Sequence, residues 1–184
     1  MTHLKVPYLS QRDNVHNPGG SCNVTSVAMV LSYFGFKGTG EGQFEDQLYT
    51  FLEDTGRSRH DPQDLKWLIE TYSRRAKRPL IDDFRPNHTF QAVQRHLDAG
   101  YPAIAHGYFT RFGHILVVVG YDAKGFFVHD PWGAWGPAGY DHDKTGKDDY
   151  FLYGTFTRLV EDYPGSGGWF HLVRPAQPPV AKAA

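Results

Sequence analysis

A chain of 184 residues with 40% hydrophobic and 15% aromatic residues is long enough to bury one hydrophobic core, and its composition suggests no second one. The 19 basic and 20 acidic residues give a formal charge of -1, so no net field attracts nucleic acid or an anionic membrane. A single cysteine excludes an intramolecular disulfide and a multi-thiolate zinc site.

The N-terminal segment MTHLKVPYLSQ lacks the basic and then apolar pattern of a secretion signal. No apolar run in the chain is long enough to cross a bilayer. We therefore expect a monomer that is cytoplasmic as encoded, with no membrane or nucleic-acid partner.

The first half of the chain has the spacing of buried helices. Apolar residues recur at helical intervals from Val24 to Phe34, and Gly35 stands where a helix that ends in a left-handed residue needs glycine. Asp61 and Pro62 form a typical helix start, as does Thr89. Three further helices are expected, over residues 44–51, 65–72 and 90–97.

From Pro102 onward the chain changes to short β-branched and aromatic runs, which are typical of strands. These runs are AIAHGYF, GHILVVVGY, GFFVHD and GWFHLV. Helices followed by strands predict an α+β fold in which an antiparallel sheet packs on the first helix.

Two segments show neither the helical nor the strand spacing of apolar residues. Residues 131–150, PWGAWGPAGYDHDKTGKDDY, are rich in glycine and aspartate, and we expect a surface loop there. The C-terminal segment RPAQPPVAKAA has no apolar period. We therefore interpret residues 1–174 as one domain and residues 175–184 as a flexible Pro/Ala-rich tail.

Cys22 is the first candidate for chemistry. It falls in the first turn of the predicted helix 24–34, where unpaired backbone donors and the helix dipole favour a thiolate. The preceding segment, SQRDNVHNPGG, is polar and ends in two glycines, so the chain can turn sharply and leave the sulfur facing a cleft. A buried, inert thiol is the alternative interpretation.

A cysteine nucleophile needs a base, and ten histidines compete for that role. His114 begins the most apolar strand, where a polar residue needs a partner. His106 and His129 are rivals that spacing alone does not dismiss, and we interpret both as structural histidines with satisfied hydrogen bonds. The others that we weigh are expected in polar loops or on exposed helix faces: His3, His16, His60, His88, His96 and His142.

Asp130 ends the strand that follows the strand of His114. If the turn between them is centred on Ala123, with Gly125 at a positive φ, Asp130 pairs opposite Leu116 and shares a sheet face with His114. Such diagonal neighbours lie about 7–8 Å apart at the backbone. The carboxylate would then hold the imidazole and leave its other nitrogen for a thiol. The alternative turn register would place the two residues on opposite faces.

An acyl-transfer site also needs donors for the developing oxyanion. We expect the backbone N–H of Cys22 to be one donor and the side-chain amide of Gln11 to be the other. Asn23 and Trp132 are candidates for the wall of the substrate cleft. Trp132 and Trp135, with Tyr140 nearby, place aromatic surface next to Asp130, and for either tryptophan core packing is an equally open interpretation.

The segment DHDKTGKDD has oxygen ligands at the first, third, fifth and ninth positions of a calcium-type loop, with Gly146 at the sixth. The twelfth position is Leu152 instead of a bidentate glutamate. We therefore favour a solvated acidic loop over a calcium site at Asp141, Asp143 and Asp149, and we expect no cofactor.

Four segments in chain order resemble one family: VPYLSQRDN, GGSCNVTSVAMVLSYFG, GHILVVVGYD and VHDPWG. They resemble the peptidases related to the bacteriocin-processing, double-glycine-leader enzymes, the thirty-ninth family of cysteine peptidases in the papain superfamily. The resemblance runs from about residue 6 to residue 133 and implies a papain-like fold. It also implies roles: Cys22 as nucleophile, His114 as base, Asp130 as the residue that orients the base, and Gln11 as oxyanion donor.

Such enzymes usually have glycine and proline directly after the cysteine, whereas this chain has Asn23 and Val24. Substrate specificity can therefore differ. The sequence predicts a cysteine peptidase or amidase that hydrolyses a peptide or isopeptide bond. One specific substrate is a bacterial cell-wall peptide, if the protein is a lysin that leaves the cell without a secretion signal. The alternatives are an inactive papain-like binding module and an acyl transferase that uses the same triad.

Overall fold

The computed structural model describes residues 1–136, 138–162 and 165–176. Its helices are η1 (Gln11–Asp13, a 3-10 turn), α1 (Cys22–Tyr33), α2 (Phe44–Asp54), α3 (Pro62–Arg75), α4 (Phe90–Asp98) and α5 (Tyr153–Val160). Its strands are β1 (Thr2–His3), β2 (Leu80–His88), β3 (Ala103–Gly107), β4 (His114–Tyr121), β5 (Gly125–Asp130), β6 (Ala134–Gly136), β7 (Gly139–Asp141), β8 (Gly146–Leu152) and β9 (Gly168–Pro175).

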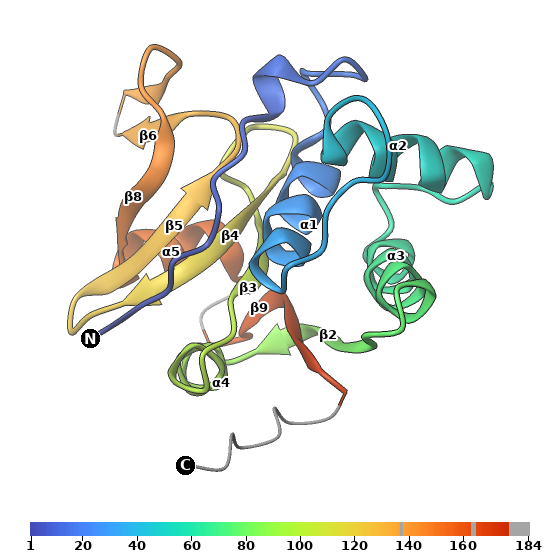
Figure 1. Cartoon of the computed structure of the whole chain (residues 1–184). Coiled ribbons are helices and arrows are strands. Elements are labelled where there is room, and N and C mark those ends of the chain that lie inside the picture. Colours follow the sequence, from blue (N-terminus) through green and yellow to red (C-terminus); the bar gives the residue numbers. More distant parts are fainter. Residues whose placement is uncertain (137, 163–164, 177–184) are drawn as a thin grey trace.

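The strands form one antiparallel sheet in the order β2-β9-β3-β4-β5-β8, and β1 adds to β4 (Figure 1). β6 and β7 form a separate hairpin. Helices α1, α2 and α3 cover one face of the sheet, and α4 and α5 cover the other. The predicted α+β, papain-like fold is confirmed.

Strand β4 lies in the middle of this arrangement and has apolar residues on both faces. Ile115 and Val117 pack toward α1, while Leu116 and Val118 pack toward α4 and α5. Every residue of β4 except the last is buried. Burial on both faces explains the continuous apolar run in the sequence.

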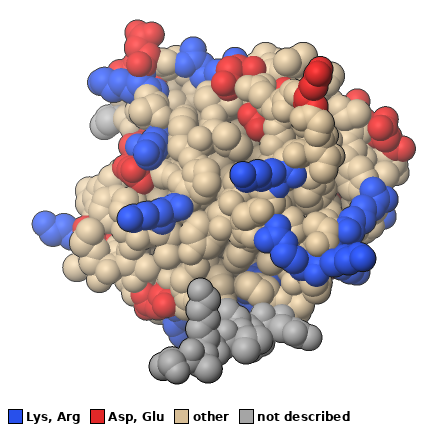
Figure 2. All heavy atoms as spheres, viewed as in Figure 1, with Lys and Arg blue, Asp and Glu red and all other residues tan. Residues whose placement is uncertain are grey.

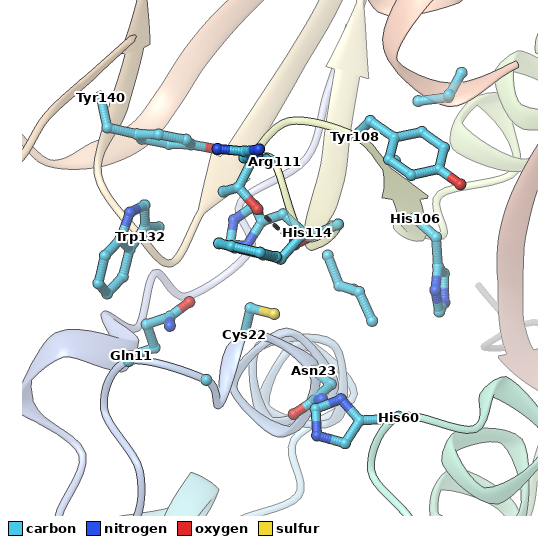
Figure 3. A pocket seen from close by; sticks show the side chains of 18 of the residues that line it. Gln11, Cys22, Asn23, His60, His106, Tyr108, Arg111, His114, Trp132 and Tyr140 are labelled. Atoms are coloured by element: carbon cyan, nitrogen blue, oxygen red, sulfur yellow. Dashed lines mark hydrogen bonds between the residues drawn. The ribbon is translucent and has the colours of Figure 1, made fainter.

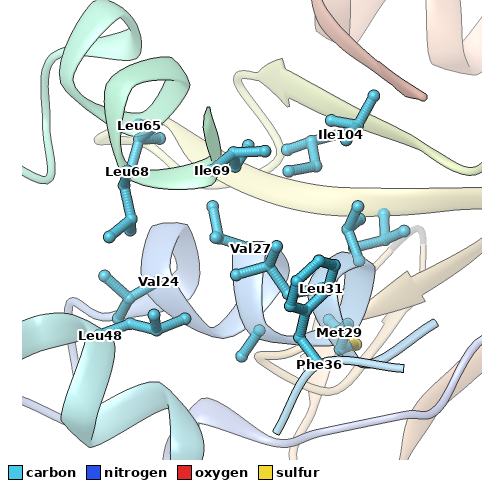
Figure 4. Close-up of a cluster of buried hydrophobic side chains, with 14 of the residues drawn as sticks. Val24, Val27, Met29, Leu31, Phe36, Leu48, Leu65, Leu68, Ile69 and Ile104 are labelled. Carbon is cyan, nitrogen blue, oxygen red and sulfur yellow. The ribbon is translucent and has the colours of Figure 1, made fainter. Parts of the chain in front are cut away.

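Helix α1 is buried along most of its length. Nine successive residues, Asn23 to Leu31, are buried, and Figure 4 shows Val24 and Val27 between α2, α3 and the sheet. The Ser26 hydroxyl donates to the carbonyl of Ile115 at 3.2 Å. The start of α1 is therefore held directly against the start of β4.

The predicted helix starts and stops agree with the structure. Asp61 accepts a hydrogen bond from the N–H of Gln63 at 2.8 Å, and Thr89 accepts one from Ala92 at 3.2 Å, so both act as N-caps. Gly35 follows α1 with a φ of 77°, the left-handed conformation that favours glycine.

The expectation that the first half contains only helices is wrong, because β2 lies within it. β2 pairs with β9 along the sheet edge. Its buried positions include Asp82 and His88, which are 0% and 7% exposed. A strand with inward polar residues lacks the apolar alternation from which strands are recognised.

The expectation of a loop over residues 131–150 is also wrong, since β6, β7 and most of β8 lie there. Gly146, which seemed a loop signal, lies opposite Asp130 in the β5–β8 ladder. A Cβ at this position would lie 2.2 Å from the Asp130 carbonyl oxygen. Glycine is needed there because two strands approach closely. The helix α5 that follows β8 was not predicted either.

The C-terminal boundary differs slightly from the expectation. Pro175, assigned to the tail, is the last residue of β9, and the N–H of Ala176 donates to the carbonyl of Pro79 at 2.9 Å. Residues 177–184 of the expected tail lie outside the described residues.

Acidic and basic side chains are interspersed over the face seen in Figure 2, with several basic ones over α3 and the segment after it. Two of these cations lie on aromatic rings: Arg75 is 4.6 Å from the Phe51 ring centroid and Arg78 is 4.2 Å from that of Phe36. Among the described helices, none is long and apolar enough to cross a bilayer.

Candidate active site

A cavity of about 960 Å³ lies where the start of α1 meets the β3–β4 end of the sheet. Its lining includes five residues singled out from the sequence, which are Gln11, Cys22, Asn23, His114 and Trp132. In Figure 3 the Cys22 side chain lies near the His114 ring, with Gln11 on one side. The fold therefore brings distant parts of the chain together. Beside the cavity, for example, Ser10 contacts Pro131, which lies 121 positions later.

Cys22 is the first residue of α1 and follows the N-cap residue Ser21. Its side chain is partly exposed and borders the cavity, so the alternative of a buried, inert thiol does not hold. Gly19 and Gly20 line the cavity as well and place no side chain in front of the sulfur. The sulfur thus lies at the positive end of the helix dipole.

His114 and Asp130 form a buried pair. The His114 Nε2 lies 2.7 Å from Asp130 Oδ1, and the two side chains are 4% and 0% exposed. Val117 lies opposite His129, which is the register that puts Asp130 level with Leu116. The predicted strand register therefore holds at this end of the hairpin.

The predicted turn does not hold. Tyr121 lies opposite Phe126, one step away from the register expected for a turn centred on Ala123, and Gly125 has no positive φ. Instead the Asp122 carboxylate accepts the backbone N–H groups of Lys124 and Gly125, at 2.7 and 3.0 Å, and closes the turn. A bulge between residues 118 and 120 then shifts the pairing back by one residue. The two departures cancel before the strands reach His114.

Asp130 receives three hydrogen bonds. Oδ1 accepts from His114 and from the backbone N–H of Trp132 at 2.9 Å, while Oδ2 accepts from the hydroxyl of Tyr140 at 2.8 Å. Burial and the adjacent carboxylate raise the pKa of Tyr140, which keeps its hydroxyl protonated as a donor. The sequence indicated Tyr140 only as nearby aromatic surface, because the short β6–β7 hairpin that carries it has no readable period.

The protonation of His114 depends on its two neighbours. Burial alone would lower its pKa, but the Asp130 carboxylate and the Cys22 sulfur raise it to about 10. Because Nε2 donates to Asp130, Nδ1 is the nitrogen left for the sulfur. At neutral pH the protonated form of His114 is therefore favoured.

Gln11 is 2% exposed and is fixed beside the cavity. Its backbone N–H donates to the carbonyl of Pro131 at 3.0 Å, and its side-chain Nε2 donates to the carbonyl of Pro18 at 2.9 Å. An amide nitrogen carries two hydrogens, so one remains for a ligand in the cavity.

The two cleft-wall candidates and the second tryptophan have different surroundings. Asn23 is 2% exposed, and its Oδ1 accepts the N–H of Val24 at 2.9 Å. Trp132 borders the cavity and contacts the His142 ring edge-on at 4.8 Å. Trp135 packs on Phe151 at 5.0 Å between ring centroids. Of the two tryptophans, only Trp132 lines the described cavity.

The remaining histidines divide into several groups. His129 uses both nitrogens, with Nε2 3.0 Å from the Val6 carbonyl and Nδ1 accepting from Asp148, so it is a satisfied structural histidine as interpreted. His88 and His96 are 7% and 9% exposed, which contradicts the expected exposure. His60, His106 and His142 line the cavity.

The acidic segment does not converge on a site. Asp141 contacts Lys144 at 2.9 Å and accepts the N–H of Asp143, whereas Asp149 accepts the N–H of Trp135 at 2.7 Å. Within the described ranges, no group of three or more His, Cys, Asp or Glu residues is arranged to hold a metal ion. The favoured interpretation is a solvated acidic loop, whereas Asp141 and residues 146–149 belong to the strands β7 and β8.

The model of the family described as Peptidase_C39 like matches residues 3–156. The chain belongs to this family. The match includes all residues of the Cys22, His114 and Asp130 cluster. No curated protein matches the chain.

Two solved structures share the papain-like fold of this C39-like chain. One is a double glycine motif protease from an AMS/PCAT transporter in complex with the leader peptide. It is 19% identical, with a TM-score of 0.57 over 95% of this chain and 94% of its own. The other, described as a C39-like peptidase from Bacillus anthracis, is 15% identical, with a TM-score of 0.61 over 97% and 98%. The family and these neighbours support a cysteine peptidase.

Proposed function

We propose that this protein hydrolyses peptide or isopeptide bonds through a Cys22–His114–Asp130 triad. The observation that carries the proposal is the 2.7 Å contact between His114 and a fully buried Asp130, with Cys22 at the other edge of the imidazole in one cavity. This arrangement supplies a nucleophile, a base and a residue that orients the base.

The reaction follows from these positions. The Cys22 thiolate attacks the carbonyl carbon, and the Cys22 N–H and the Gln11 amide stabilise the negative oxygen that forms. The His114 imidazolium gives its proton to the leaving amine as the C–N bond breaks, which leaves a thioester on Cys22. Water, deprotonated by His114, then cleaves the thioester and regenerates the thiol.

The substrate that we propose is a peptide chain. The cavity lies under the β3–β4 loop, where Tyr108 and Phe112 are 66% and 95% exposed and Arg111 extends over the site (Figure 3). Aromatic and cationic groups of this kind suit an extended peptide. The transporter protease with the same fold was solved with a leader peptide, and a bacterial cell-wall peptide is the specific substrate that we put forward for this chain.

The test is incubation of the protein with purified peptidoglycan and, separately, with a mixed peptide library, followed by mass spectrometry of new termini. We expect new termini from at least one of the two, and a loss of about 10⁴-fold or more on Cys22→Ala. His16→Gln, an exposed change outside the described cavity, serves as control. Hydrolysis that survives Cys22→Ala would overturn the proposal.

The same experiment separates the alternatives. Addition of a primary amine as acceptor would yield an amide product from an acyl transferase, whereas a hydrolase yields a free carboxylate. A binding module gives no product with either material. Its Cys22 would also be alkylated with the pH dependence of a free thiol. The proposed triad predicts alkylation at lower pH instead, because His114 takes the thiol proton.

A further inference from the structure

A second carboxylate and imidazole array leads into the same cavity. The His171 Nδ1 lies 2.6 Å from Asp82 Oδ2, and the His171 Nε2 lies 2.9 Å from the Nε2 of His106. Asp82 and His171 are both 0% exposed, and His106 lines the cavity. The three residues come from β2, β9 and β3, which are neighbours in the sheet.

The surroundings keep water from the inner part of this array. The Phe84 ring lies 4.6 Å from the His171 ring, and Trp169 lies near both Phe84 and His106, at 5.9 and 6.3 Å between centroids. The Oδ1 atom of Asp82 is buried and has no hydrogen-bonding partner in the described part of the chain. A net charge inside such surroundings would be costly.

The nearby charged groups do not compensate the Asp82 carboxylate. Lys66 contacts the backbone carbonyl of Asp82, but its ammonium is also paired with Glu70. Electrical neutrality of the array therefore requires three titratable protons on Asp82, His171 and His106 together.

Two of these protons have fixed places. One lies in the hydrogen bond between Asp82 and His171, and one lies in the bond between the two Nε2 atoms. The third could lie on Asp82 Oδ1, where a buried hydroxyl would have no acceptor among the described residues, or on His106 Nδ1. The second position is favoured, because His106 lines the cavity and no hydrogen bond joins its Nδ1 to another described residue.

We propose that His106 Nδ1 is a fixed hydrogen-bond donor in the substrate cleft and binds a carbonyl oxygen of the peptide chain that is cleaved. The proposal rests on the proposed peptidase function. His106 lies opposite Ile115 and next to Gly107, which pairs with His114. Because one extended residue spans about 3.3 Å, the bound carbonyl belongs to a residue within about three positions of the scissile bond.

Other polar groups line the same cavity. His60 reaches it from the loop before α3, Tyr108 and Arg111 from the β3–β4 loop, and Asp162 from the segment after α5. A His106 ring without net charge favours a neutral carbonyl over a free carboxylate as its ligand. Burial and the neighbouring His171 hold the pKa of His106 well below its ordinary value, which agrees with a neutral donor ring.

The first test needs no substrate. Long-range ¹H–¹⁵N spectra of the ¹⁵N-histidine-labelled protein distinguish an imidazole protonated on Nδ1 from one protonated on Nε2. We expect the His106 signals, assigned by their loss in His106→Gln, to show a proton on Nδ1. An unprotonated Nδ1 at neutral pH would overturn the proposal, whether or not the protein is a peptidase.

The second test uses the peptide of the mixed library that the wild type cleaves fastest. We expect His106→Phe to raise KM by about two- to tenfold and to leave kcat unchanged, since a single neutral hydrogen bond is lost from ground state and transition state alike. His106→Gln, which keeps an N–H donor, should recover part of the loss. His16→Phe is the matched control, and thermal melting of each variant reports folding.

Thioamide analogues of that peptide locate the acceptor. Replacing one carbonyl oxygen by sulfur weakens acceptance, so one position should raise KM in the wild type and have no effect in His106→Phe. If the effect appears only with a free C-terminus and is lost in the C-terminal amide, the ligand is a carboxylate and the neutral-carbonyl assignment is wrong. Cleavage that His106→Phe leaves unchanged overturns this proposal alone, whereas no cleavage by the wild type overturns both proposals.

Discussion

Two buried Asp–His pairs lie at the same end of the molecule. They differ in the group that the second nitrogen of each imidazole contacts. In the Asp130–His114 pair that nitrogen faces the Cys22 sulfur, and in the Asp82–His171 pair it meets a second imidazole, His106. The two carboxylate contacts are similar, at 2.7 and 2.6 Å. The pair itself therefore does not determine the chemistry.

The two carboxylates also differ in their other contacts. Asp130 accepts two further hydrogen bonds, from Trp132 and Tyr140, whereas one oxygen of Asp82 has no partner within the described residues. A carboxylate with three donors is stabilised as an anion and can support an imidazolium. Hence the first pair suits proton transfer to and from a thiol, and the second suits a fixed hydrogen-bond donor.

The largest expected difference between the two pairs is in kcat. Asp130→Asn should lower kcat by about 10²- to 10⁴-fold, because an amide can favour the wrong imidazole tautomer and cannot stabilise the imidazolium. The corresponding change Asp82→Asn should act mainly on KM through His106. Steady-state kinetics on one peptide measures both, and equal effects on kcat would contradict the distinction.

A third buried histidine sharpens the comparison because it has no carboxylate contact among the described residues. His96 lies in α4, with Nε2 3.0 Å from the carbonyl of Val173. Burial lowers its pKa from 6.5 to about 4. Beside a carboxylate the pKa of His114 rises instead, to about 10. Burial therefore favours the neutral ring unless an anion is adjacent.

The expected consequence is a loss of stability in acid. Below pH 6.5 the unfolded chain binds a proton at His96 that the folded chain does not bind until about pH 4, so stability falls as the pH falls through this window. His96 by itself contributes a loss of about 2 kcal/mol between pH 7 and pH 5. Urea unfolding at both pH values should show this loss in the wild type and a smaller one in His96→Phe. Equal losses would show that His96 does not titrate in this window.

The sequence allowed one pair to be predicted and not the other, for physical reasons. His114 begins and Asp130 ends two consecutive strands whose apolar pattern is clear in the sequence, so their contact depended only on the strand register. Asp82, His106 and His171 come from three strands, and β2 was missed because Asp82 occupies an inward position where an apolar residue would have marked the strand. A pairing between residues 89 positions apart also has no local signal.

The register itself shows where prediction from sequence is weakest. Neither the turn at Asp122 nor the bulge after Val118 could be read from the residues, and each alone would have moved Asp130 to the other face of the sheet. The contact with His114 agrees with the prediction because the two shifts have opposite signs. At this turn the Asp122 carboxylate accepts two backbone N–H groups. These hydrogen bonds, and not a positive φ at Gly125, determine the conformation of the turn.

The smallest expected effect concerns the hydroxyl that distinguishes Asp130 from Asp82. Tyr140→Phe removes the 2.8 Å hydrogen bond to Asp130 Oδ2 and leaves that buried oxygen unsatisfied. A change of about 1 kcal/mol in the stabilisation of the imidazolium is expected, which lowers kcat by about fivefold and leaves KM unchanged.

A matched control exists in the same chain. Tyr150 of β8 also donates to a carboxylate, that of Asp122 in the β4–β5 turn, at 2.7 Å, and it lies outside the described cavity lining. Tyr150→Phe removes the same kind of bond and should leave kcat unchanged. The pH dependence of Cys22 alkylation adds a readout that a purely structural loss would not move. Without the Tyr140 hydroxyl, the strength of the hydrogen bond between Asp130 and the His114 imidazolium changes. The pH midpoint of Cys22 alkylation should therefore shift in Tyr140→Phe and not in Tyr150→Phe. The same midpoint in both variants would mean that Tyr140 only fills space behind the aspartate.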